Sequence, residues 1–202
     1  MKQCDSRTID GLPILSPYKK AMDRVDAGLS LIRLHDPVRY RRLTRDLKRI
    51  WLRHLPGCIG RFDPPSWTCE LDSRFVQDNE TTTEMVAALI VHEATHARLW
   101  RHGIRYEENI RFDVEGVCIR REIAFSAKLP EGGLVRQRAA RKLDALSNMD
   151  LSDAAKRKRL RERMEGTLRG IGMPQWIVKL LLDYGDWLHH RRLARATHRP
   201  AR

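Results

Sequence analysis

The chain has no hydrophobic run that approaches the ~20 residues a membrane-spanning helix needs. Its first residues, Met-Lys-Gln-Cys-Asp, are followed by no hydrophobic segment of the kind found in secretory signals. Its four cysteines include no Cys-x-x-Cys pair, which argues against a structural zinc ribbon. These absences predict a cytoplasmic protein with no membrane partner, whose cysteines are free thiols.

Aromatic residues make up only 6% of the 202 residues, and no internal repeat is present, whereas the 42% of hydrophobic residues suffices for a core. The positive charge is uneven. Residues 1–130 hold 22 Lys and Arg against 18 Asp and Glu, and residues 131–202 hold 17 against 8. We therefore expect a core over residues 1–130 and a basic helical C-terminal part over residues 131–202 that packs on it. The basic part is either a solvated surface or a binding region for nucleic acid or another polyanion.

A helix with two histidines on one face is the most informative feature of the chain. Residues 92 to 96 read His-Glu-Ala-Thr-His and directly follow an apolar run, in a helix predicted from about 82 to 102. His92 and His96 are four residues apart, so both imidazoles can bind one zinc ion, with Glu93 beside them as a general base. The alternative is an amphipathic helix with two surface histidines. A carboxylate in an otherwise apolar helix is costly unless a cation compensates it, which favours a metal site.

A catalytic zinc ion usually has three protein ligands and a water molecule, so another ligand must exist. His102 has the spacing of the metzincin motif, but Leu99 occupies the position where that motif needs a glycine turn. On a continuous helix His102 faces away from the other two histidines, and we expect it to lie at the helix C-terminus. Glu115 is the favoured third ligand, and it belongs to a second predicted helix over residues 109–128. Glu122 returns to the same face of that helix, so it is either an alternative ligand or a group that orients a histidine.

Eighteen residues separate the His-Glu-x-x-His motif from Glu115. This spacing resembles that of part of the gluzincin group of zinc metallopeptidases. The segment Glu115-Gly116-Val117-Cys118 is similar to the Glu-Gly-x-small signature on the gluzincin glutamate helix. There, the small residue allows that helix to pack closely on the active-site helix. The resemblance covers about residues 67–129. A common gluzincin pattern has Asp four residues after the ligand Glu, but Ile119 occupies that position here, which leaves Glu122 as the best group to orient His92 or His96.

The resemblance implies an α+β, predominantly helical fold, with a zincin-like active-site helix and a glutamate helix beside a small β-sheet. Polar and apolar residues alternate over residues 66–76, which we expect to form an edge strand. In zincins such a strand binds extended peptide by strand addition, although an ordinary edge strand is equally compatible with the pattern.

The resemblance also implies an enzyme, a zinc-dependent metallopeptidase that hydrolyses peptide bonds in a peptide or protein substrate. His92, His96 and Glu115 would bind Zn²⁺, and Glu93 would take a proton from the metal-activated water. Tyr106 is a candidate donor to the developing oxyanion, with ordinary packing as the alternative. His189 and His190 are weaker candidates for that role.

Further helices are predicted at residues 17–34, 37–54, 134–147, 152–169 and 174–193. The last of these carries an apolar stripe that we expect to pack on the core. The competing function is a zinc-bearing protein on the same scaffold without peptidase activity. It would bind nucleic acid or an acidic partner through its basic C-terminal region.

Overall fold

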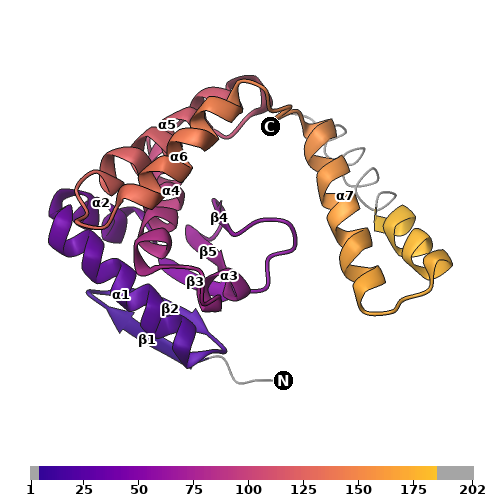
Figure 1. Cartoon of the computed structure of the whole chain (residues 1–202), viewed down its shortest axis with the longest axis horizontal. Helices are drawn as coiled ribbons and strands as arrows, with labels where there is room; N and C mark the ends of the chain where they lie inside the picture. Colours follow the sequence, from indigo (N-terminus) through magenta and orange to yellow (C-terminus); the bar gives the residue numbers. More distant parts are fainter. Residues whose placement is uncertain (1–4, 186–202) are drawn as a thin grey trace, which may run out of the picture. The chain divides into compact units, whose positions relative to one another are not determined.

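The computed structural model describes residues 5–185 of the chain (Figure 1). Its fold is α+β and predominantly helical, as predicted, with a five-stranded mixed sheet. None of the helices in this described range is long and apolar enough to cross a membrane. His189, His190 and the predicted helix beyond residue 185 lie outside the described residues.

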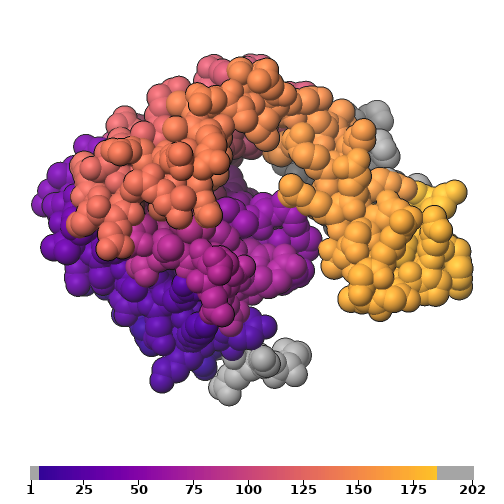
Figure 2. Space-filling model, viewed as in Figure 1, coloured from indigo at the N-terminus to yellow at the C-terminus, as the bar shows by residue number. Residues whose placement is uncertain are grey.

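The chain divides into two units, Met1–Leu151 and Ser152–Arg202. Residues 131–151 therefore belong to the first unit, although the surplus of positive charge begins at about residue 131. The reason is that Ala139 and Leu146 form a small apolar cluster with Ile119 of the preceding helix. In the space-filling view the described part of the first unit is one continuous body (Figure 2).

The first unit begins with a hairpin and two helices, β1 (Asp5–Ile9), β2 (Leu12–Ser16), α1 (Lys19–His35) and α2 (Pro37–Asp46). Three strands and a short helix follow, β3 (Arg49–Arg53), β4 (Gly60–Asp63), β5 (Thr68–Asp72) and α3 (Ser73–Gln77). The site-bearing helix α4 (Thr83–Arg101) precedes a 3₁₀ turn (Glu108–Ile110), α5 (Arg111–Ser126) and α6 (Gly133–Leu146). The second unit contains α7 (Asp153–Gly170) and a helix whose described part is 175–185.

The strand order in the sheet is β1-β2-β3-β5-β4. Strands β2, β3 and β5 run parallel to one another, and β1 and β4 pair antiparallel at the two ends. The prediction of an edge strand at residues 66–76 is therefore wrong. The segment forms β5 inside the sheet, β4 occupies the edge, and the strand ends at Asp72, which caps α3 through the backbone N–H of Arg74 and Phe75.

The burial of β5 explains why its sequence was misleading. Cys69 and Leu71 face the hydrophobic core, and Glu70 on the opposite face is also buried, at 3% exposure. Its carboxylate is neutralised by Arg53 of β3 and Arg61 of β4, which lie on either side of it. The polar half of the alternation therefore reflects cross-strand ion pairs and not a solvent-exposed edge.

The predicted helix over residues 37–54 is also partly wrong, because α2 ends at Asp46 and Arg49–Arg53 forms β3. Within β3, Ile50 and Leu52 are fully buried while their neighbours are partly exposed, the alternation expected of a strand. The strand exists because it pairs on both sides, with β2 and β5.

Helix α4 lies at the centre of the first unit (Figure 1), and it packs on α1, α2, α5 and β4. Gly28 lets α1 approach α4 closely, because a Cβ at this residue would lie 3.3 Å from the backbone nitrogen of Ala87 in α4. All residues of α4 from Val86 to Val91 are buried. Its N-cap is Thr82, whose side chain accepts a hydrogen bond from Met85 N.

Candidate metal centre

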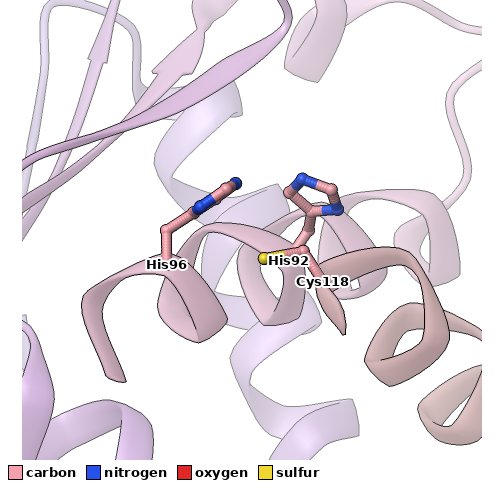
Figure 3. A group of neighbouring side chains, drawn as sticks. All are labelled: His92, His96 and Cys118. Carbon is pink, nitrogen blue, oxygen red and sulfur yellow. The ribbon is translucent and has the colours of Figure 1, made fainter. Parts of the chain in front are cut away.

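His92 and His96 lie side by side on one face of α4 (Figure 3). Their ring centroids are 5.1 Å apart, and their side chains are 14% and 12% exposed. The two imidazoles are thus close enough to share a cation, and each keeps only a small exposed area. This is the arrangement expected from their four-residue spacing on a helix.

The carboxylate of Glu115 bridges the two histidines. Its Oε2 lies 3.4 Å from His92 Nε2, and its Oε1 lies 3.7 Å from His96 Nε2. The Tyr106 hydroxyl donates a hydrogen bond to Glu115 Oε1, and the Tyr106 ring stands edge-on to His96 at 5.3 Å between centroids. Tyr106 therefore lies at the site, where its hydroxyl fixes the position of Glu115.

Glu122 lies on the other side of His92, with Oε2 3.4 Å from His92 Nδ1. Its second oxygen lies 3.3 Å from the ammonium of Lys142 on α6. The structure therefore places Glu115 next to both Nε2 atoms and Glu122 behind one of the histidines. Glu122 is thus adjacent to the nitrogen of His92 that does not face Glu115, where Ile119 has no polar group to offer.

Glu93 follows His92 on α4, and its carboxylate lies against β4. It is 4% exposed, and the backbone N–H of Phe62 donates to its carboxylate. A Cβ at Gly60 would lie 3.0 Å from Glu93 Oε1, so the glycine leaves the space that the carboxylate occupies. The site and the edge strand of the sheet therefore meet at Glu93.

The pKa values show that the cluster attracts positive charge. Burial disfavours a charged His92, but hydrogen bonds with Glu115 and Glu122 outweigh it and raise the His92 pKa to about 10. Burial also opposes ionisation of Glu115, but His92, His96 and Tyr106 lower its pKa to about 2. For Glu93, burial raises the pKa to about 7. A divalent cation would neutralise the negative charge that these glutamates bring to the site, of which Lys142 offsets only that of Glu122.

Cys118 offers a second donor set, which was not predicted from the sequence. Ligand atoms of His92, His96 and Cys118 all lie within 4.8 Å of one another (Figure 3). The Cys118 side chain is fully buried between α5 and α4, and burial raises the pKa of its thiol. Its burial also agrees with the predicted role of a small residue at a close helix crossing.

His102, the other histidine considered from the sequence, lies elsewhere. It is the C-cap of α4, as expected, and lines a separate cavity between α2, α4 and α5. The sequence-based prediction missed Lys142, because α6 comes beside Glu122 only through tertiary packing. It also missed Gly60 and Phe62, although a glycine in a short strand signals a close approach to the backbone.

No protein-family profile, curated protein or solved structure matches the chain. The functional argument therefore rests on the geometry of the site.

Proposed function

We propose that the protein is a zinc-dependent metallopeptidase of the gluzincin type, with Zn²⁺ bound by His92, His96 and Glu115. The observation that carries the proposal is the position of Glu115, whose two oxygens face one nitrogen of each histidine. The donor set of two imidazoles and one carboxylate matches that of known catalytic zinc sites. The proposal includes a cytoplasmic location, which the buried free thiols of Cys69 and Cys118 support.

When bound, the zinc ion would supply a polarised water molecule of lowered pKa. Glu93 would accept the proton of that water and return it to the leaving amine. A pKa of about 7 suits both steps, because the carboxyl group can hold or release a proton near neutral pH. Tyr106 holds Glu115 in place, and its role as oxyanion donor stays a prediction.

Strand β4 is the segment on which we expect the substrate to bind. It lies at the end of the sheet and pairs on one side with β5, so among the described strands its other edge has no partner. Its residue Phe62 contacts the carboxylate of Glu93 through the backbone. An extended peptide that pairs with this edge would run past the general base, with recognition mainly through main-chain hydrogen bonds.

The direct test compares zinc-loaded wild type with Glu93→Gln on a peptide library derived from a digested proteome, with cleavage products read by mass spectrometry. Wild type should cleave, and Glu93→Gln should keep its zinc and lose at least about 100-fold of the rate. The matched control is Glu84→Gln, on the same helix but in its first turn, which should cleave like wild type. Equal cleavage by Glu93→Gln and wild type would overturn the assignment of the general base.

Cobalt substitution distinguishes the two ligand sets. A thiolate bound to Co²⁺ gives an intense near-ultraviolet charge-transfer band, whereas imidazole and carboxylate ligands do not. We expect the Co²⁺ protein to lack this band, because Glu115 supplies the third donor. A strong band that disappears in Cys118→Ala would assign the site to His92, His96 and Cys118 instead.

The second candidate function is that of a zinc-bearing protein that binds nucleic acid or an acidic partner. The observation in its favour is α7, which has no buried residue and carries the basic run Lys156–Arg159. Binding of a nucleic acid through phosphate contacts should weaken steeply as the salt concentration rises. A zinc-loaded protein with no cleavage activity but with such salt-sensitive binding would favour this function over the peptidase.

A further inference from the structure

A cavity of about 560 Å³ lies between α2, α4 and α5, on a side of α4 that does not carry the metal centre. Its lining from α4 includes Val91, Ala94 and Leu99, whereas His92 and His96 do not belong to it. The volume lies within the range of small-molecule binding sites, roughly 300–1,000 Å³. Nothing in the proposed peptidase mechanism uses this cavity.

The lining of the cavity is strongly basic. Five cationic side chains line it, against two carboxylates. Helix α2 contributes Arg39 and Arg42. Helix α4 contributes Arg98, α5 contributes Arg121, and Lys128 follows shortly after the end of α5. A concave surface with a surplus of positive charge focuses the electrostatic field and favours an anionic ligand.

The two carboxylates already bind three of the five cations. Asp36 lies 2.9 Å from both the Arg39 Nε and the Lys128 Nζ, and it is 5% exposed. The other carboxylate, Asp46, lies 3.4 Å from Arg98 NH1 and is 2% exposed. These buried aspartates hold the cations in defined positions, so the site is preorganised.

Arg42 and Arg121 differ from the other three cations. Both are exposed, and within the described residues neither has an ion pair or a side-chain hydrogen bond. They belong to different helices, α2 and α5, that border the same cavity. Two guanidinium groups that border one cavity are well suited to bind a phosphate group. Each guanidinium can donate two parallel hydrogen bonds to phosphate oxygens.

We propose that this cavity binds a phosphorylated small molecule, with Arg42 and Arg121 on its phosphate groups and the apolar α4 surface against its uncharged part. A multiply charged phosphate or diphosphate matches the surplus of cations better than a monocarboxylate does. The site is separate from the metal centre, so the proposal does not depend on peptidase activity.

The test is isothermal titration of the full chain with inorganic pyrophosphate at physiological salt. The double variant Arg42→Gln/Arg121→Gln should bind about 10–100-fold more weakly than wild type, because it loses two charge-assisted contacts. The matched control is Arg41→Gln/Arg120→Gln. It removes the same charge from the same two helices at the adjacent exposed positions, outside the cavity lining, and should change affinity less than about twofold.

Four outcomes would overturn the proposal. Equal weakening in both double variants would show that pyrophosphate responds only to the overall positive charge. Unchanged affinity in the cavity variant would show that pyrophosphate binds elsewhere, for example at the metal centre. Absence of binding by wild type, or equally tight binding of acetate, would show that the cavity is not a phosphate site.

Discussion

The carboxylate of Glu122 lies 3.4 Å from Nδ1 of His92, whereas Glu115 faces the other nitrogen of the same ring. A carboxylate on the second nitrogen fixes the tautomer and the orientation of a metal-binding imidazole. We predict that Glu122→Gln lowers zinc affinity by about 10–100-fold without removing the site. Competition with a zinc-sensitive dye measures this, with the exposed Glu108→Gln as the control.

The same pair of glutamates supplies a sharper comparison. Glu115→Ala should lose zinc far more completely than Glu122→Ala, because Glu115 is adjacent to both histidines. If Glu122→Ala instead loses the metal and Glu115→Ala keeps it, the third ligand is Glu122.

Glu93 should make the metal-free protein less stable as the pH rises. Burial raises its folded pKa from 4.5 to about 7, so its favourable contribution is complete below pH 4.5 and is lost as the pH rises through 7. In chelator-treated protein, Glu93→Gln should match wild type at pH 4.5 and be more stable by about 2–3 kcal/mol at pH 8. Urea unfolding at both pH values measures the difference. A stability gap that does not change with pH would contradict the assigned shift.

Gly60 is predicted to control the position of the general base. A methyl group at this residue would lie 3.0 Å from Glu93 Oε1 and 2.9 Å from Leu89 Cδ1, so one of these groups must move. We expect Gly60→Ala to keep zinc and to lose about 10-fold or more in kcat, since small displacements of catalytic groups are costly. Gly133→Ala is the control, because its Cβ would meet nothing within 4 Å. Full activity in Gly60→Ala would contradict the claim that Gly60 of β4 controls the position of Glu93.

Asp72 is predicted to set part of the acid sensitivity of the fold. Burial opposes its ionisation, but Arg74 and the backbone N–H of Leu55 outweigh this and lower its pKa below 3.8. The stabilisation is therefore present above pH 3.8 and is lost as the pH falls through the lower, folded-state pKa. Asp72→Asn should cost about 1–3 kcal/mol at pH 7, and the gap should close in acid. Thermal unfolding from pH 7 to pH 2 tests this. A gap that persists unchanged at pH 2 would contradict the role of its charge.

The sequence predicts well those features that depend on residues close together in the chain. The two helices α4 and α5 follow from helical spacing and end signals, and the same spacing brings His92 and His96 together. The positions of Glu115 and Glu122 relative to these histidines required a packed pair of helices, which the small residue Cys118 helps to explain. Whether these residues bind zinc stays a prediction.

The features that were missed depend on partners distant in sequence. Arg49–Arg53 continues a helix-like composition, but it becomes β3 because β2 and β5 lie on either side. The edge strand is β4, because β4 pairs with β5 on the side away from β3, and Arg53 and Arg61 neutralise the Glu70 that lies between them. The sequence of β5 alone does not predict that Glu70 is buried, since the arginines that neutralise it belong to other strands.

The most direct measurement is zinc per chain, by elemental mass spectrometry on untagged protein, for wild type, Glu115→Ala and Cys118→Ala. The account predicts about one zinc ion in wild type and in Cys118→Ala, and much less in Glu115→Ala. No zinc in wild type after reconstitution, or full retention in Glu115→Ala, would contradict it.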